Sequence, residues 1–195
     1  MGYRHYLYAV DKELVGKIRK CKTKEELITL MKTEAPDSVS DGSEDEDSYV
    51  RLYDIGKKLF EFGKYYPNAD NMYEHGDSLF TSDELNKEYA DYGAIIIDPD
   101  GLKCAIDWCR QHVVEIYEDL LREKSVDPFD DRSQELRMRD HAESYLRWWK
   151  YDPANMDMSS ENIVSSWLYE HEYFELVRIY KTFDWGKSQI MFMGW

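Results

Sequence analysis

Two β-prone stretches lie at opposite ends of the chain, YRHYLYAV at residues 3–10 and QIMFMGW at residues 189–195. The first alternates aromatic and polar side chains, which is typical of a strand. Another β-prone run covers residues 174–183, and the turn-forming DWGK at residues 184–187 joins it to the last strand, so we predict a C-terminal hairpin. Strands at both ends with helices between them predict a helix-rich α+β fold, in which the first strand and the hairpin form a small mixed or antiparallel sheet.

The composition predicts one domain that folds without disulfides or a metal. The chain has 195 residues, of which 43% are hydrophobic and 15% aromatic, and this is enough for a full core. We therefore predict a single α+β domain over residues 1–195. Cys21, Cys104 and Cys109 do not have the spacing of a disulfide scaffold or a metal site, and Cys109 falls on an apolar helical face. No apolar run reaches the ~18 residues needed to cross a bilayer and no signal core is seen, so we expect a cytoplasmic location.

Helix signals fill the interior of the chain. Asp11 is a candidate N-cap, and capping boxes at residues 23–26 and 81–84 predict two more helix starts. The apolar spacing of three and four is clearest over residues 102–124. We also expect helices at residues 49–66, at residues 134–151 and from residue 160, and a buried strand at residues 94–97.

Residues 34–48 interrupt the helical pattern. They contain Pro36, Gly42, four serines and seven acidic residues. So few apolar side chains cannot offset the entropy of ordering the segment, so we predict a mobile acidic insertion within the domain. A solvated charge run is the favoured interpretation, ahead of a contact surface for a basic partner.

The acidic balance is the strongest functional clue. With 25 basic and 40 acidic residues the formal charge is −15, which disfavours nucleic acid and anionic membranes. The charge would attract a basic protein, although solubility alone is the favoured interpretation. Residues 67–131 alone carry −12. We therefore predict that such a partner contacts the helix at residues 102–124. The acids expected to bind it are Asp107, Glu115, Glu118 and Asp119, and neutralising them should weaken binding more than deleting the acidic insertion.

One local string carries a candidate catalytic pair. IIIDPDG at residues 95–101 resembles the first motif of haloacid-dehalogenase-type phosphatases, an apolar strand followed by Asp-x-Asp-Gly. The resemblance implies that Asp98 is a nucleophile, that Asp100 is an acid or base, and that both lie at Mg²⁺. Leu102 stands where that family has Thr or Ser. The alternative, which we favour, is a turn that joins a strand to a helix, with Asp100 near the helix N-terminus.

The other catalytic and metal-binding motifs that we considered are incomplete or missing from the sequence. HEYFE at residues 171–175 has a glutamate where a zinc-binding helix signature has its second histidine. No Gly-x-Ser-x-Gly and no glycine-rich phosphate loop occurs. We therefore expect no cofactor.

The favoured hypothesis is a non-enzymatic interaction or regulatory protein of a bacterium or phage. It would bind a basic protein by charge complementarity, as immunity proteins and inhibitors do. Two alternatives stay open: a Mg²⁺-dependent, phosphatase-like enzyme that uses Asp98 and Asp100, and a structural assembly subunit.

Overall fold

The computed structural model describes residues 4–42, 48–62, 69–122, 146 and 170–194. The chain divides into two compact units, one made of residues 1–102 and 182–195 and the other of residues 103–181. The helices expected at residues 134–151 and from residue 160 fall outside the described residues, apart from residue 146 and the last part from residue 170. A single domain over the whole chain stays a prediction.

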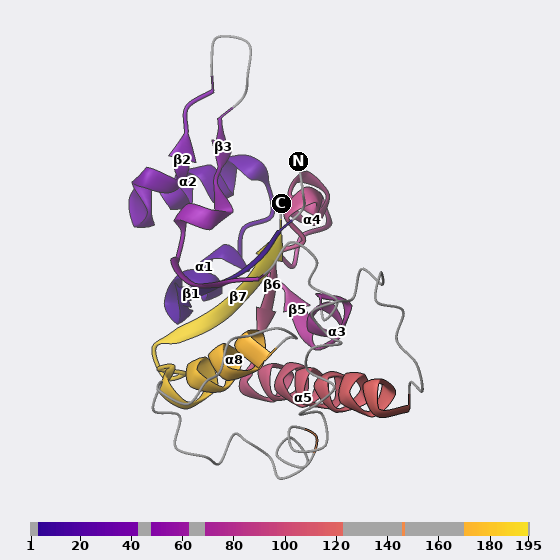
Figure 1. Ribbon diagram of the computed structural model, residues 1–195. Coiled ribbons are helices and arrows are strands. Elements are labelled where there is room, and N and C mark those ends of the chain that lie inside the picture. The colour runs from indigo at the N-terminus through magenta and orange to yellow at the C-terminus, as the bar shows by residue number, and fades with distance from the viewer. Residues whose placement is uncertain (1–3, 43–47, 63–68, 123–145, 147–169, 195) are drawn as a thin grey trace. The chain divides into compact units, whose positions relative to one another are not determined.

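A five-stranded antiparallel sheet forms the centre of the first unit (Figure 1). Its order is β4-β1-β7-β6-β5. The bounds of the strands are β1 His5–Asp11, β4 Lys57–Glu61, β5 Gly76–Ser78, β6 Ile95–Ile97 and β7 Ser188–Gly194. The first strand, β1, and the last strand, β7, pair along their whole length, from His5 opposite Gly194 to Asp11 opposite Ser188. The α+β class and the pairing of the first strand with the last are therefore confirmed.

The first strand of the predicted C-terminal hairpin is wrong. Residues 174–182 belong to a helix, α8 Glu170–Thr182, in the second unit. Its buried side chains include Tyr173, Leu176 and Val177, and this spacing of three and four is helical. Glu175 pairs with Arg178 one turn later at 2.6 Å. The β-branched and aromatic residues of this run had concealed the helical period.

The helix expected at residues 49–66 is also wrong. This stretch forms the short strand β3 Tyr49–Val50, the 3-10 turn η2 Leu52–Asp54 and β4. β4 pairs with β1, and a Cβ at Gly56 would lie 2.7 Å from the carbonyl oxygen of Ala9, so only glycine permits this approach. Pairing with a strand some 50 residues away decided the structure here, and local pattern does not report such pairing.

The predicted helix starts at Asp11 and Thr23 are confirmed, and the third helix starts one residue later than its capping box predicts, at Ser82 in place of Thr81. Asp11 accepts hydrogen bonds from the backbone amides of Glu13 and Leu14, and Thr23 and Ser82 cap the next two helices. These helices are α1 Lys12–Ile18, α2 Lys24–Glu34 and α4 Asp83–Glu88. α3 Ala69–Glu74 and the 3-10 turn η3 Ala90–Tyr92 complete the unit, together with the turn η1 described next.

The first part of the predicted acidic insertion contains regular structure. Residue 34 ends α2, η1 Pro36–Ser38 follows, and β2 Val39–Ser40 pairs with β3. The Ser38 hydroxyl is buried and donates to the carbonyl of Ala35. These contacts fix residues 34–42, whose apolar content had suggested irregular structure, and residues 43–47 lie outside the described residues.

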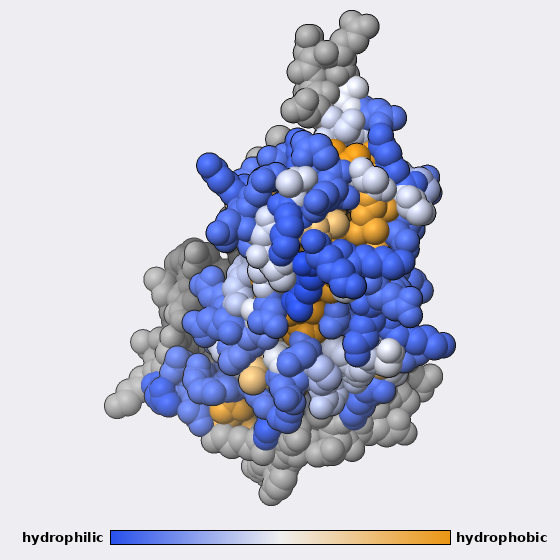
Figure 2. Space-filling view, turned by 180° about the vertical axis from the view of Figure 1, so that it is seen from behind, coloured by the Kyte–Doolittle hydropathy of each residue, from blue (hydrophilic) through white to orange (hydrophobic). Residues whose placement is uncertain are grey.

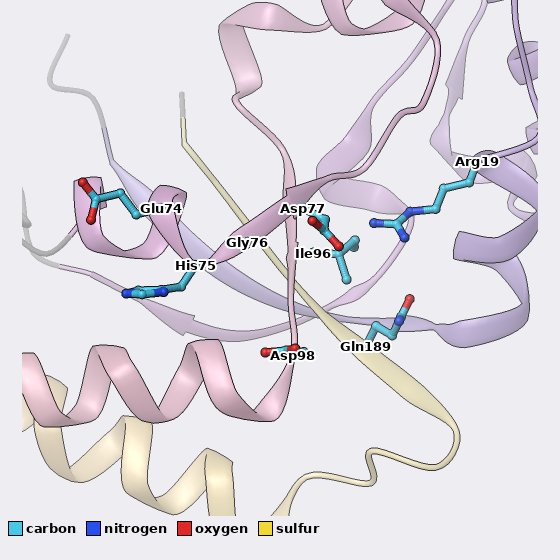
Figure 3. Close-up of a pocket in the computed structure, with 8 residues that line it drawn as sticks. All are labelled: Arg19, Glu74, His75, Gly76, Asp77, Ile96, Asp98 and Gln189. Carbon is cyan, nitrogen blue, oxygen red and sulfur yellow. The ribbon is translucent and has the colours of Figure 1, made fainter.

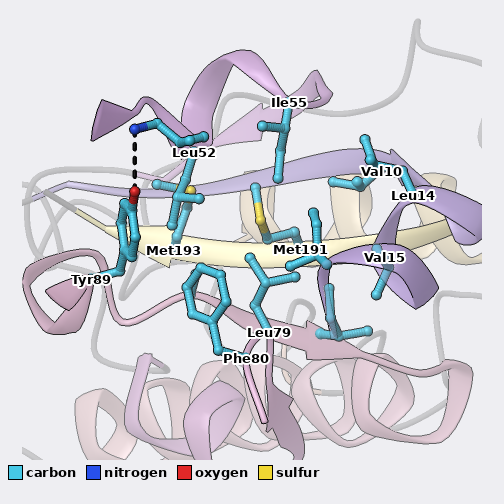
Figure 4. Close-up of a cluster of buried hydrophobic side chains, with 14 of the residues drawn as sticks. Val10, Leu14, Val15, Leu52, Ile55, Leu79, Phe80, Tyr89, Met191 and Met193 are labelled. Atoms are coloured by element: carbon cyan, nitrogen blue, oxygen red, sulfur yellow. Dashed lines mark hydrogen bonds between the residues drawn. The ribbon is translucent and has the colours of Figure 1, made fainter. Parts of the chain in front are cut away.

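The core of the first unit lies on one face of the sheet (Figure 4). Strands β1 and β7 contribute Val10, Met191 and Met193, and helix α1 and the turn η2 pack over them. The opposite face is buried as well, because the side chains of Leu7, Ile97 and Phe192 are each at most 1% exposed. There the ring of His5 stacks on that of Phe192, with centroids 5.1 Å apart.

The second unit contains α8 and most of α5 Pro99–Arg122. The buried face of α5 includes Ala105, Cys109 and Val113, which confirms Cys109 as a core residue. Within the described part of the chain, no helix has the length and apolarity that a membrane span requires.

Candidate binding pocket

A cavity of about 290 Å³ opens beside the edge of the sheet in the first unit (Figure 3). The edge strand β5, its neighbour β6 and the start of β7 form its walls, and the C-cap of α1 and the end of α3 close it. The residues that line it are Arg19, Glu74, His75, Gly76, Asp77, Ile96, Asp98 and Gln189. The topology therefore brings together four segments that are far apart in the sequence.

The edge strand β5 presents unpaired backbone groups. It pairs with β6 so that Asp77 lies opposite Ile96, and the amide of Leu79 continues the ladder by donating to the carbonyl of Ala94. Since an antiparallel ladder alternates, the backbone groups of Gly76 and Ser78 face away from β6. One of them is used: the carbonyl of Ser78 accepts a hydrogen bond from Nη2 of Arg19 at 3.1 Å.

Arg19 is held at the pocket by its backbone as well as by its side chain. Its carbonyl accepts a 2.7 Å hydrogen bond from the hydroxyl of Thr81, and the hydroxyl of Ser82 bonds the carbonyl of Lys22 nearby. The Nε of Arg19 is buried and has no hydrogen-bond partner within the described residues. A buried donor of this kind is costly unless a ligand or water supplies an acceptor.

Three carboxylates line the same cavity. Oδ1 of Asp98 accepts a 2.7 Å hydrogen bond from the amide of Gly101 and so caps helix α5. Asp77 is exposed and forms no described hydrogen bond or ion pair. In Figure 3 the side chains of Arg19, Asp77 and Gln189 point into one space, whereas Glu74 points away from it.

The side chains that face the cavity carry a net negative charge, because the guanidinium of Arg19 meets the carboxylates of Asp77 and Asp98, whereas the side chain of Glu74 points away. Such a lining attracts a small cation that can donate hydrogen bonds. The described residues hold no group of three or more His, Cys, Asp or Glu side chains able to bind a metal ion. A guanidinium or ammonium group has both the positive charge and the hydrogen-bond donors.

Of the predicted catalytic pair, Asp98 lines the pocket and Asp100 does not. Asp98 lies in the pocket as a helix cap, and Asp100 lies in the first turn of α5, exposed and outside the pocket lining. Strand β6 ends at Ile97 and helix α5 begins at Pro99, so residues 95–101 join a strand to a helix and Asp100 lies near the helix N-terminus, as expected. A carbonyl oxygen of His75 lies 2.5 Å from where a Cβ at Gly101 would stand, which explains the glycine at this turn.

The four acids predicted to bind a partner all lie on α5, and each has a neighbour on its own helix. Asp107 pairs with Lys103 at 2.6 Å, and Asp119 pairs with Arg122 at 2.6 Å. Glu115 accepts a hydrogen bond from Gln111, and Glu118 pairs with Arg122 at 3.2 Å. Their charges are partly compensated before any partner arrives.

A second acidic region lies before the helix, within the acidic residues 67–131, and was not singled out from the sequence, namely residues 69–98, here called the acidic segment. It contains eight acidic residues and one basic residue, Lys87, and all eight acidic residues are exposed. The acids are Asp70, Glu74, Asp77, Asp83, Glu84, Glu88, Asp91 and Asp98. By contrast α5 has five acids and three bases. Counting charge by element instead of by a 65-residue window would have found the difference.

Comparison with protein-family models, with curated proteins and with solved structures finds no match to this chain.

Proposed function

We propose that this chain is a non-enzymatic interaction protein that binds a basic protein through its acidic segment. The observation that carries the proposal is the set of eight exposed acids in residues 69–98 beside a single base. Among the described residues only Glu88 of this set forms an ion pair, with Lys24 at 2.7 Å. Arg19, Lys22 and Lys24 lie against this segment and offset part of its charge, and the acidic excess that remains steers a basic protein toward the surface.

The distribution of apolar surface supports the same mode of binding. Among the described residues, the large hydrophobic side chains that are exposed are Tyr49 and Leu121, each at 38%. Figure 2 shows one face of the molecule, on which the described residues are mostly hydrophilic. A partner would therefore gain little from burying apolar area on these residues, and charge is the main source of complementarity.

The test is capture of partners by the immobilised full chain at low and at high salt, with identification by mass spectrometry. We expect a basic protein that is retained at low salt and released at high salt, because screening weakens contacts between exposed charges. Failure to retain any basic protein at low salt would overturn the proposal.

Two matched variants locate the surface. The first neutralises four acids of the acidic segment, D70N, E74Q, D77N and D91N, and the second neutralises the four acids of α5, D107N, E115Q, E118Q and D119N. Each removes four negative charges, so the total charge of the two proteins is equal. We expect the first variant to lose more of the captured partner. A larger loss with the second would return the interface to α5, as the sequence predicts, and equal losses would point to a general charge effect.

A further inference from the structure

The pocket at the edge of the sheet differs from the rest of the acidic segment because it is concave and contains both a donor and acceptors. Asp77 and Gln189 offer oxygen acceptors, and Arg19 faces them across the cavity (Figure 3). A flat acidic surface would attract any cation, whereas a cavity of about 290 Å³ selects by size and hydrogen bonding.

The charge of the lining decides the head group of the ligand. The carboxylates of Asp77 and Asp98 outnumber the one guanidinium, so both would repel an anion bound to Arg19. A guanidinium or ammonium group is attracted by the same side chains and can donate to Asp77 and to the amide oxygen of Gln189. Ile96 supplies apolar surface against which the aliphatic stem of such a side chain can lie.

Arg19 decides what else the ligand must carry. Its Nε is buried without an acceptor among the described residues, and its Nη2 is committed to the carbonyl of Ser78. A ligand that brings a carbonyl oxygen next to its positive group would satisfy this donor. A peptide with a basic side chain has both features, whereas a simple amine or a metal ion has only the charge.

We propose that this pocket receives a lysine or arginine side chain of the partner protein, with a peptide carbonyl of the same segment accepting a hydrogen bond from Arg19. The inference rests on the proposed function and specifies the chemistry of its contact. Asp77 is the main acceptor, because both of its carboxylate oxygens lack a described hydrogen bond, whereas Oδ1 of Asp98 already accepts one from the amide of Gly101.

The experiment is a titration of the isotope-labelled full chain with a capped Gly-Arg-Gly peptide, followed by the amide resonances in nuclear magnetic resonance spectra. We expect saturable shifts at Gly76, Asp77 and Gln189. The same peptide with citrulline has the same shape without the charge and should bind at least about tenfold more weakly, as loss of a charge-assisted hydrogen bond implies. Equal binding of the two peptides would overturn the proposal.

Two variants separate the pocket from the general field. D77N should weaken Gly-Arg-Gly binding about tenfold, whereas D91N, which removes the same charge outside the pocket lining, should change it less than about twofold. If D91N weakens binding as much as D77N does, the peptide responds to the field and not to the pocket.

A third variant tests the carbonyl contact. R19M removes a positive charge, so it should strengthen binding of ethylguanidinium, which has no carbonyl, while the peptide loses its contact with Arg19. The ratio of peptide to ethylguanidinium affinity should therefore fall. An unchanged ratio would remove Arg19 from the proposal, and spectra of the free variant establish that the fold is intact.

The failures of the two proposals are distinguishable. If a basic protein is captured and D77N retains it as well as the unaltered chain does, the proposed function stands and the pocket is not its contact. If Gly-Arg-Gly binds at Asp77 and no basic protein is captured, the pocket binds basic groups and the proposed function is wrong.

Discussion

The central strand β7 and the edge strand β5 belong to one sheet and differ in almost every physical respect. β7 pairs with β1 on one side and β6 on the other, and its residues Ile190, Met191, Phe192 and Met193 are fully buried. β5 has three residues, Gly-Asp-Ser, pairs on one side among the described strands and exposes Asp77 and Ser78. Short, charged edge strands resist pairing with other chains. The difference teaches that burial fixes the centre of this sheet, while the edge is free to carry charge and a pocket.

The largest effect on stability is expected at Phe192, in the centre of the buried strand β7. Its ring contacts those of His5 and Tyr73 at centroid distances of 5.1 Å, and of Phe62 at 5.8 Å. F192A should lower the free energy of unfolding by about 3–5 kcal/mol, through lost burial and the cavity that remains. Denaturant unfolding measures the effect. F192L keeps much of the volume and should cost clearly less, and equal costs for the two variants would argue against a tightly packed centre.

The next effect concerns the attachment of the β2-β3 hairpin to the core. The hydroxyl of Tyr89 accepts a hydrogen bond from the amide of Val50 at 3.2 Å within the buried cluster (Figure 4). Y89F leaves that amide without its partner, which should cost about 1–3 kcal/mol. Hydrogen exchange at Val50 should also become faster. A variant with unchanged stability would mean that water reaches this amide readily.

Much of the fold follows from local chemistry. β1 and β7 are recognisable by their β-prone composition, and the helices after Asp11, Thr23 and Ser82 by the capping chemistry of their first turns. α5 is recognisable by its apolar spacing. In each of these cases a local signal marks the element, namely a β-prone run, a cap or a helical apolar spacing, so the sequence reports the element even where its partner is distant.

The rest depends on contacts that the sequence does not display. β4 forms because it pairs with the edge of β1, and the local sequence around residue 57 does not indicate that pairing. The aromatic and β-branched residues of α8 fit either period, and the buried spacing of Tyr173, Leu176 and Val177 is seen only once the helix is known. The pocket is harder still, because it joins Arg19, residues 74–77, residues 96–98 and Gln189, which only the sheet topology brings together.

A smaller effect on stability should appear as a dependence on pH at the centre of the sheet. Burial against Phe192 and Tyr73 lowers the pKa of His5, and the nearby carboxylate of Asp70 offsets this only in part. A histidine with a lowered folded pKa binds its proton more readily when unfolded, so its contribution is complete above about pH 6.5 and is lost as the pH falls.

Unfolding measured between about pH 7.5 and 5.5, above the range of ordinary carboxylates, isolates this effect. The unaltered chain should become less stable toward the acid end, and H5F, which keeps an aromatic ring, should show a flatter profile. D70N removes the compensating carboxylate, so its profile should fall more steeply. A profile for H5F as steep as that of the unaltered chain would show that the ring is hydrated.

The smallest effect on stability is expected at the edge strand β5, where a single substitution tests the contrast with β7 directly. Asp77 is exposed and has no described hydrogen bond or ion pair, so D77N should change the free energy of unfolding by less than about 0.5 kcal/mol. The same substitution should weaken binding of the arginine peptide about tenfold. The two measurements together separate two roles. Substitution of a residue needed for folding lowers stability, whereas substitution of a residue needed only for binding weakens binding and leaves stability unchanged. A large loss of stability would make Asp77 part of the fold, and its effect on binding would then follow from that loss and not from a contact with the ligand.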